Sequence, residues 1–370
     1  MSGEPRTLLL RGGRILDPAS GRDEIGDLLL RDGRVAAAGG RLAAPPDAEV
    51  LDVAGAVVTP GWIDLHCHLR EPGFEYKETI QGGAAAAAQG GFTTVCCMPN
   101  TNPPPDTPER VADLYARARG AAVRVLPIAT ITQGRKLLEP VDYAALAAAG
   151  AIGFSDDGDS TRSSAAMRAA LAASRELRRP VMVHCEDPDL VRGGALNDGA
   201  VSRALGLPGS PGVAEDVMLA RDLTIAGDTG GWLYACHVTT AASVQLIREA
   251  KARGVQVTAE ATPHHLALTD DWVGGDRRFY WERATSATPP GQPADPNTKV
   301  NPPLRTGADV EALAAGVRDG TIDTIGTDHA PHAPRDKGND YRVAAFGMLA
   351  FEVALPSLLT AVRAGALGLP

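Results

Sequence analysis

The chain has 370 residues, enough for one large domain with an appendage, and 44% of them are apolar while only 4% are aromatic. Its formal net charge of -9 gives no reason to expect nucleic acid or an anionic membrane as a partner. No apolar run is long enough for a transmembrane helix, and the start lacks the core of a signal peptide. Five cysteines in apolar runs suit free thiols in a reducing compartment. We therefore predict a soluble, cytoplasmic protein.

Residues 1–57 predict a small β module. Three short β-like pieces follow one another, TLLLRGGRILDP, DLLLRDGRVAAAG and AEVLDVAGAVVTP. The tripeptides Arg11-Gly12-Gly13 and Arg31-Asp32-Gly33 are typical of turns between apolar runs. We expect these pieces to form a small antiparallel sheet.

Residues 58–370 show a different pattern, in which strand-like runs alternate with Ala-rich helical stretches such as 163–178 and 240–254. This alternation predicts parallel βαβ units. The strand-like runs are VVTPGWIDLHCHL, TTVCCMPN, RVLPIATIT, AIGFSDDG, PVMVHCED, WLYACHVTT, VQVTAEATPHHL and IDTIGTDHAPH. Eight such runs predict an α/β fold, a closed (β/α)₈ barrel of the TIM type.

Polar residues gather at the ends of these runs. They are His66, His68, Asn100, Asp156, Asp157, His184, His237, Asp328, His329 and His332. A lone histidine is more often a structural residue than a ligand. However, the C-terminal ends of barrel strands meet at one mouth, where active sites are built. Agreement among several strand ends therefore predicts a site.

The residue types in this set are those of a metal centre. Because a strand has a period of two, His66 and His68 point to the same face. His184 and His237 add two nitrogens, and aspartates at the fourth and eighth strand ends add oxygens. This exceeds the needs of one tetrahedral zinc and matches two metals bridged by a carboxylate. Spacing alone does not choose between Asp156 and Asp157 as the bridge, because they point to opposite faces.

The motifs HCHLREPG, KET, MPNTNP, GFSDDG, HCED, HVTT, KVNPPLR and GTDHAPH, in this order, resemble those of the amidohydrolase superfamily. Within it they are most similar to the dihydroorotases of the bacterial class I type, and the resemblance runs from about residue 7 to about residue 358. It implies a (β/α)₈ barrel with a small β module. It also implies the reversible cyclisation of N-carbamoyl-L-aspartate to L-dihydroorotate in de novo pyrimidine biosynthesis, with these small molecules as partners.

The resemblance also assigns roles to single residues. His66, His68 and Asp328 would hold one zinc ion, His184 and His237 a second, and Asp157 would bridge the two. AIGFSDDGDS contains no lysine, so the chain resembles the subgroup that uses an aspartate instead of a carboxylated lysine. A hydroxide shared by the metals would attack the ring amide, with Asp328 as the catalytic acid and base. Substrate contacts would come from His68, Arg70, Asn100, Asn301, His332, Phe346 and Gly347.

Several alternatives stay open. Dihydropyrimidinases, hydantoinases and allantoinases share the barrel and metals, but the absent lysine disfavours them, as do Arg70 and Asn100, which suit an acidic substrate. A non-catalytic partner of aspartate transcarbamoylase is disfavoured by the full ligand set, although a complex with that enzyme, or a homodimer, is compatible with it. The native metal, zinc, cobalt or manganese, is not fixed by the sequence.

Three segments depart from the pattern or fit it loosely. Relatives continue past the eighth helix and add strands to the module, whereas this sequence stops at AGALGLP, so we expect those strands to be missing. The segment 274–298 contains three consecutive aromatic residues and is either a mobile loop near the mouth or surface packing. His264 and His265 cannot share a face, so at most one lines the pocket, and a structural role is at least as plausible.

Overall fold

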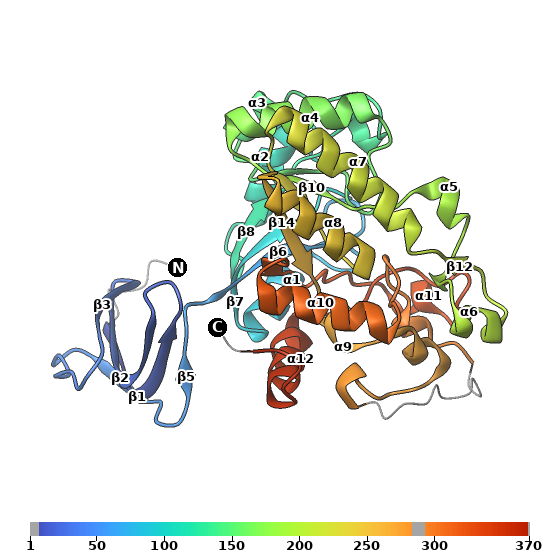
Figure 1. Ribbon diagram of the computed structural model, residues 1–370. Coiled ribbons are helices and arrows are strands. Elements are labelled where there is room, and N and C mark those ends of the chain that lie inside the picture. Colours follow the sequence, from blue (N-terminus) through green and yellow to red (C-terminus); the bar gives the residue numbers. More distant parts are fainter. Residues whose placement is uncertain (1–6, 283–292, 369–370) are drawn as a thin grey trace. The chain divides into compact units, whose positions relative to one another are not determined.

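The computed structural model describes residues 7–282 and 293–368, which divide into one unit up to residue 62 and a second unit from residue 63 (Figure 1). In the first unit, strand β1 (Thr7–Asp17) pairs antiparallel with β2 (Arg22–Arg31), and β2 pairs antiparallel with β3 (Arg34–Ala38). Asp32 and Gly33 both have positive φ, 54° and 72°, as a tight hairpin turn requires. The turn predicted at residues 31–33 is therefore confirmed.

Two expectations for this unit were wrong. Strands β4 (Glu49–Asp52) and β5 (Val57–Val58) pair parallel with β1, so the sheet is mixed and not antiparallel. The reason is that residues 39–48 carry the chain from β3, at one edge, past β2 and β1 to the other edge. Residues 11–13 form an irregularity in the pairing within β1 and not a turn, so the strand continues through both glycines.

The second unit contains the predicted barrel strands, the first of which begins at Trp62, a residue counted with the first unit. In the described residues these strands are β6 (Trp62–Cys67), β7 (Phe92–Cys97), β8 (Arg124–Pro127), β9 (Phe154–Ser155), β10 (Val181–Val183), β13 (Leu233–Ala235), β14 (Val257–Ala261) and β15 (Thr324–Ile325). The pairing of β7 with β8 is parallel, and so are the pairings that join β9, β10, β13, β14 and β15.

The strands close into a ring. They pair in the order β6-β7-β8 and β9-β10-β13-β14-β15. A parallel bridge between Ala129 and Phe154 joins β8 to β9, and one between Cys67 and His329 joins the end of β6 to the segment after β15. The amide of Asp328 also donates to the carbonyl of His66 at 3.0 Å. This closure places the first and last strand ends side by side.

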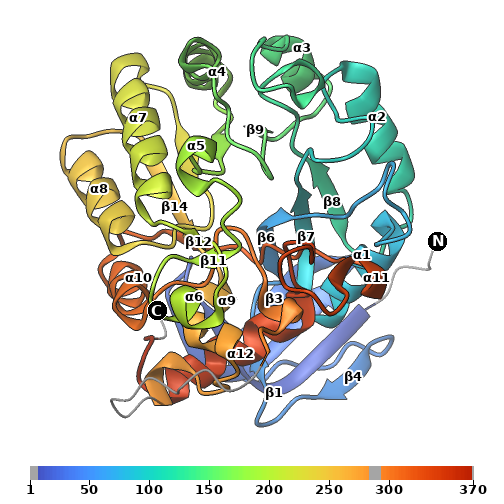
Figure 2. The same ribbon diagram turned by 90° about the vertical axis from the view of Figure 1, so that its right-hand side faces the viewer.

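Helices follow the strands and surround them (Figure 2). Side-chain caps fix where several begin: Ser163 accepts from the amide of Ala166, and Thr240 from that of Ser243. The long helices are α1 (Ile80–Gln89), α2 (Pro108–Arg117), α4 (Ser164–Leu177), α7 (Val213–Thr229), α8 (Ala241–Ala252), α10 (Gly307–Asp319) and α12 (Phe351–Arg363). A shorter helix, α3 (Tyr143–Ala148), follows β8.

Short elements lie in the connections that follow the strands. They are α5 (Pro188–Val191), β11 (Leu196–Asn197), α6 (Ala200–Leu205), β12 (Gly209–Ser210), α9 (Pro263–Ala267) and α11 (Pro334–Lys337), with the 3₁₀ turns η1 (Gln133–Arg135), η2 (Asp270–Gly274), η3 (Tyr280–Glu282) and η4 (Pro296–Thr298). Of the described helices, none is long and apolar enough to cross a bilayer.

The barrel core consists mainly of aliphatic and small side chains, as the composition predicts. One cluster joins the strands to the outer helices through residues such as Val183, Leu219 and Ile247. Cys96, Met98, Ile128, Met182, Tyr234 and Cys236 form a separate cluster.

The aromatic residues of segment 274–298 pack on the surface. The rings of Phe279 and Trp281 stack with centroids 4.8 Å apart, and Tyr280 and Trp281 lie against the main core cluster. The Tyr280 hydroxyl donates to Glu311 at 3.0 Å. These contacts favour the packing interpretation for the three rings. Residues 283–292 of the segment lie outside the described residues.

Candidate metal centre

The six predicted ligands meet inside the barrel mouth. His66 lies in β6, and His68 follows it; Asp157, His184, His237 and Asp328 follow β9, β10, β13 and β15. None of the six is more than 6% exposed. The ring centroids of His66 and His237, which belong to different predicted pairs, are 5.1 Å apart. The structure thus brings both histidine pairs to one place.

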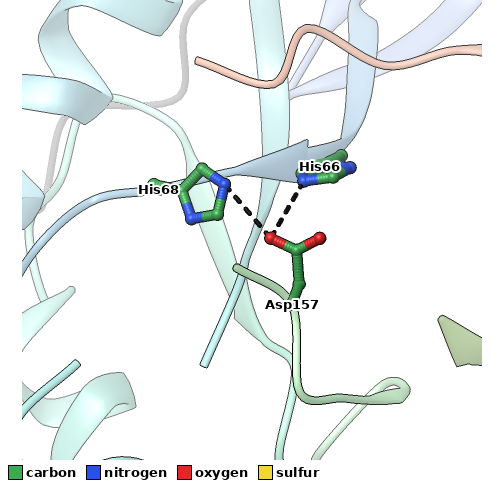
Figure 3. A group of neighbouring side chains, drawn as sticks. All are labelled: His66, His68 and Asp157. Carbon is green, nitrogen blue, oxygen red and sulfur yellow. Dashed lines mark ion pairs between the residues drawn. The ribbon is translucent and has the colours of Figure 1, made fainter. Parts of the chain in front are cut away.

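The Asp157 carboxylate lies between the two pairs. Its Oδ2 is 3.5 Å from Nε2 of His66 and 3.4 Å from Nε2 of His68 (Figure 3). Its Oδ1 is 3.3 Å from Nε2 of His237 and 3.9 Å from Nδ1 of His184. One carboxylate oxygen therefore faces each pair, which is the arrangement of a bridging ligand.

Asp156 has a different environment. Its carboxylate accepts hydrogen bonds from the amides of Ile131 and Thr132 and from the hydroxyls of Thr132 and Thr161, at 2.8–3.1 Å. Its oxygens are fully used in holding the loop after β8 to the loop after β9. Spacing alone did not distinguish Asp156 from Asp157, but their geometry does: Asp157 faces the histidines, and Asp156 does not.

Asp328 lies beside the first pair of predicted ligands. Its Oδ1 lies 3.0 Å from Nε2 of His68 and 3.5 Å from Nε2 of His66. The backbone of Asp328 has φ 46°, and that of His237 has φ 32°, both in the left-handed region that non-glycine residues rarely adopt. Such conformations cost on the order of 1 kcal/mol or more and are found where the surroundings fix a functional side chain.

The hydrogen bonds of His66 and His68 leave lone pairs directed at carboxylates. Nδ1 of His66 is 2.9 Å from Oε1 of Glu260, and Nδ1 of His68 is 2.8 Å from Oδ1 of Asn100, and both partners accept hydrogen bonds. In a neutral ring, Nε2 of each histidine then carries a lone pair that faces Asp157. His66 Nε2 and Asp157 Oδ1 have no hydrogen-bond partner among the described residues. A cation between these atoms would satisfy them, so the residues fit a metal.

The electrostatics of the site favour the same conclusion. Burial opposes the charged ring of His66, but the carboxylates of Glu260 and Asp157 outweigh it and raise the pKa of His66 well above its ordinary value. Burial likewise opposes the Asp157 carboxylate, yet His66 and His237 hold the pKa of Asp157 well below its usual range. Burial opposes the Asp328 carboxylate as well, but the neighbouring His68, 3.0 Å away, and His66 lower the pKa of Asp328. The carboxylates of the site therefore stabilise a positive charge placed between them, as a metal ion would be.

A second group of predicted residues lies beside the centre. The Arg70 side chain is buried, with φ 63° in its backbone; its Nε donates to the carbonyl of Pro331 at 3.0 Å, and its Nη2 lies 3.2 Å from Nε2 of His332. Nε2 of His332 is 2.7 Å from the carbonyl of Phe346, and the amide of Gly347 donates to the carbonyl of Lys299. These residues form one connected cluster.

The two predicted asparagines contact histidines of the metal centre. Asn100 is bonded to His68, and Asn301 Nδ2 lies 3.2 Å from Nε2 of His184 and donates to Oε2 of Glu186 at 2.9 Å. The predicted substrate residues are thus gathered around the metal centre and the cluster beside it.

The sequence interpretation missed two carboxylates. Glu260, fully buried in β14, accepts from His66, from the Tyr234 hydroxyl at 2.6 Å and from the amide of His237. A lone glutamate near the end of a buried strand was the available signal. Glu186, in HCED, lies 3.4 Å from His184 Nε2. Partners of this kind orient metal-binding histidines. His66, Glu260 and Cys236 also form a close group of potential ligand atoms.

The adjacent histidines of ATPHHL differ from each other. Both ring nitrogens of His265 are bonded, one to the Thr262 hydroxyl at 2.8 Å and one to the carbonyl of Pro302 at 2.9 Å. This is a structural role. His264 is buried, and its ring nitrogens have no hydrogen-bond partner among the described residues. Burial lowers the pKa of His264 to about 4, so this ring is neutral near pH 7.

Known proteins with similar sequences identify the family. A family model described as "Dihydro-orotase-like" matches residues 55–243. The chain is 47% identical to a dihydroorotase of Pelotomaculum thermopropionicum over 361 residues, 97% of this chain and 80% of the relative. It is 46% identical to a dihydroorotase of an Anaeromyxobacter species over the same shares. The chain belongs to the dihydroorotase family.

Solved structures with similar folds are more distant in sequence. An L-hydantoinase (dihydropyrimidinase) from Arthrobacter aurescens has a TM-score of 0.79 and 24% identity, and covers 98% of this chain and 78% of its own. A dihydropyrimidinase from Brevibacillus agri has a TM-score of 0.78 and 22% identity over the same shares. At this identity the likeness shows the fold alone. The predicted (β/α)₈ barrel of the amidohydrolase type is confirmed.

Proposed function

We propose that this member of the dihydroorotase family interconverts N-carbamoyl-L-aspartate and L-dihydroorotate by closing or hydrolysing a cyclic amide. The observation that carries the proposal is the position of the Asp157 carboxylate, with one oxygen toward each histidine pair. Family membership supports the substrate class, and the geometry supports a hydrolytic centre with two cations.

We propose zinc as the metal, with two ions per chain. His66, His68 and Asp328 would hold the first ion, His184 and His237 the second, and Asp157 both. Imidazole and carboxylate are ligands that suit zinc. When bound, two such ions would lower the pKa of a shared water and polarise the carbonyl of the amide.

Asp328 is the proposed acid and base. Its lowered pKa keeps it a carboxylate near neutral pH, which is the ionisation state that an acceptor of a proton needs. In hydrolysis it takes a proton from the attacking water and passes it to the ring nitrogen while the C–N bond of the amide breaks. In cyclisation the same proton moves in the opposite direction. The backbone at Asp328 bonds to the carbonyl of His66, which fixes the carboxylate beside the histidines.

The substrate carboxylate is proposed to bind beside the metals. Arg70 would supply a planar guanidinium, which matches a carboxylate, and Asn100 and His332 would supply further contacts. His68, Asn301 and the backbone of Phe346 and Gly347 would complete the contacts with the ring. The buried position of Arg70, with Nε already bonded, supports a role inside the site over that of a surface cation.

A direct assay tests the proposal. Purified chain is loaded with zinc, its metal content is measured by mass spectrometry, and dihydroorotate, hydantoin and allantoin are supplied in parallel. We expect about two zinc ions per chain and turnover of dihydroorotate in clear preference to the other two. Faster turnover of hydantoin or allantoin would favour the related cyclic amidases. A chain that binds no metal and turns over none of the three would favour a non-catalytic partner.

We further propose that the enzyme works in the cytosol, a location supported by its five buried, unpaired cysteines. Assembly as a homodimer or with aspartate transcarbamoylase is a separate proposal. Sedimentation of the chain alone and mixed with that enzyme tests it.

A further inference from the structure

Lys77, in the KET segment, lies beside His332 and has no role in the mechanism above. Its Nζ is 3.2 Å from Nδ1 of His332 and 3.7 Å from Oδ2 of Asp336. The Lys77 and His332 side chains are only 16% and 8% exposed. The lysine therefore contacts a proposed substrate residue from the side away from the Phe346 carbonyl.

The contacts of His332 define which of its nitrogens carries the proton. A lysine ammonium only donates, so Nδ1 must present its lone pair to Lys77. A carbonyl only accepts, so Nε2 must carry the hydrogen that is donated to Phe346 at 2.7 Å. Both contacts require the Nε2–H tautomer. The 3.2 Å approach of Arg70 Nη2 to Nε2 is then a contact between two donors and not a hydrogen bond.

The tautomer of His332 decides whether Arg70 is available to a substrate carboxylate. With hydrogen on Nε2, that hydrogen is donated to the Phe346 carbonyl, and Arg70 Nη2 has no acceptor on this ring, so its hydrogens stay available to a substrate carboxylate. With hydrogen on Nδ1, the Nε2 lone pair would accept from Arg70 instead. The Phe346 carbonyl would then lose its donor on this ring, and the guanidinium would be engaged by a neighbouring side chain.

We propose that Lys77 is a positioning residue that fixes His332 as the Nε2–H tautomer, and thereby keeps Nη2 of Arg70 free as a donor for a substrate carboxylate. The inference rests on the proposed function for its kinetic consequence. Its structural part, the tautomer of His332, stands without that function.

The charges around His332 predict the effect of removing Lys77. The ring faces three cations, Arg70, Lys77 and Lys337, and one carboxylate, Asp336, whose Oδ2 is 3.9 Å from Nδ1. Burial and the cations lower the pKa of His332 to about 3, so the ring is neutral at assay pH. Without the ammonium, Asp336 becomes the nearest charged partner of Nδ1 and favours hydrogen on that atom.

Nitrogen NMR tests the tautomer directly. In zinc-loaded protein with ¹⁵N-labelled histidine, the resonances of His332 are assigned by their loss in His332→Gln. We expect the neutral Nε2–H form in the wild type from pH 6 to 8. In Lys77→Met, which keeps a long unbranched side chain and removes the ammonium, we expect the Nδ1–H form. A wild-type ring with hydrogen on Nδ1 would overturn the inference.

Steady-state kinetics test the consequence. We expect Lys77→Met to raise KM for dihydroorotate about 10-fold, as for one weakened hydrogen bond to a charged group, with kcat changed much less. Lys77→Arg retains a donor and is expected to recover most of this loss. Lys77 and Arg335 both lie over the Tyr76 ring, 5.6 Å and 4.3 Å from its centroid, and Arg335 is exposed, so the matched control is Arg335→Gln. It removes a nearby cation without touching His332.

The outcomes separate the two proposals. An equal rise in KM for Arg335→Gln and Lys77→Met would mean that general charge, and not the tautomer, is responsible, and would overturn the inference. An unchanged KM in Lys77→Met would overturn it as well. If the wild type turns over no dihydroorotate, the proposed function fails, and NMR still decides whether Lys77 sets the tautomer.

Discussion

Asp328 touches both histidines of HCH, and its position allows its two proposed roles to be separated by experiment. Asp328→Asn keeps the size of the side chain and one oxygen, but removes the carboxylate that would accept a proton. We expect kcat to fall by about 10²–10⁴-fold, the usual contribution of a general base, with most of the zinc retained. The measurement is kcat together with metal content and circular dichroism. Wild-type turnover in this variant would contradict the acid–base assignment.

The adjacent aspartates of GFSDDG allow a paired test, because they have opposite surroundings. Asp157→Asn weakens a group that faces four histidines, so we expect loss of zinc and activity with little loss of stability in metal-free protein. Asp156→Asn replaces an acceptor of four hydrogen bonds with a group that also donates, and buried unsatisfied groups cost about 1–3 kcal/mol each. We expect it to lower the free energy of unfolding by at least that amount.

The measurements are urea unfolding of the metal-free proteins and zinc content of the native ones. A stable Asp156→Asn that loses zinc, or an Asp157→Asn that keeps it, would reverse the assignment of the two residues.

At the scale of single residues, some features of the site could be predicted from the sequence and others could not. His66 and His68 share a face because of the period of a strand, and this needs no tertiary information. The choice between Asp156 and Asp157 needs the orientation of β9 in the barrel, because spacing only states that they differ. Glu260 contacts His66, and Lys77 contacts His332. In each pair the two residues lie far apart in the sequence, so no local pattern predicts the contact. The roles of all these residues stay predictions.

At the scale of elements, the connection between α7 and β13 contains a close approach that a small change can probe. Gly231 lies where its missing Cβ would overlap the backbone carbonyl of Leu171 in α4. Gly227, near the end of α7, is exposed, and a Cβ atom added there would make only ordinary contact with Val255, at 3.5 Å. The two glycines are close in the chain and differ in what surrounds them.

We expect opposite effects of the same substitution. Gly231→Ala forces two backbones apart and should lower the free energy of unfolding by about 1–3 kcal/mol. Gly227→Ala removes a helix-interior glycine and should raise it by about 0.5–1 kcal/mol. Urea unfolding of the two variants beside the wild type measures both. A stable Gly231→Ala would mean that α4 and the start of β13 can separate without cost.

Elements with strong local signals were predictable, and those that depend on crossing the sheet were not. The helix after Ser163 and the helix after Thr240 begin where their caps stand in the sequence. In the β module, by contrast, Arg11-Gly12-Gly13 has the composition of a turn but continues as a strand, because pairing with β2 on both sides holds it extended. The parallel pairing of β4 and β5 depends on a crossover that composition does not encode.

At the scale of the whole molecule, the barrel explains why the strand-end pattern was informative. Closing the ring through His66, Cys67 and the residues after β15 brings the first and last motifs together, and His68 and Asp328, in contact here, stand 260 positions apart in the sequence. A fold that places every strand end at one mouth converts a set of isolated residues into a site. The barrel and the set of predicted ligands could therefore be predicted together, because a barrel brings the strand ends together and the polar strand ends indicate a barrel.

The same closure would couple metal binding to the stability of the barrel. The proposed ligands come from β6 and from the segments after β6, β9, β10, β13 and β15, so bound metal would link strands around the ring. A ligand that binds only the folded state, present at about 1,000 times its Kd, adds about 4 kcal/mol to the free energy of unfolding. We expect a chelator to lower Tm by several degrees, and added zinc to restore it.

Two variants test whether this stabilisation by zinc comes from the candidate metal centre. Asp157→Asn should abolish the shift in Tm between chelated and zinc-loaded protein, because its carboxylate faces both histidine pairs. Asp228→Asn alters an exposed carboxylate on α7 that pairs with Arg168, and should keep the wild-type shift. Differential scanning calorimetry at matched zinc concentrations compares the three proteins. If Asp157→Asn keeps the full shift, the stabilising zinc is bound elsewhere on the chain, and the histidines at the mouth are not its ligands.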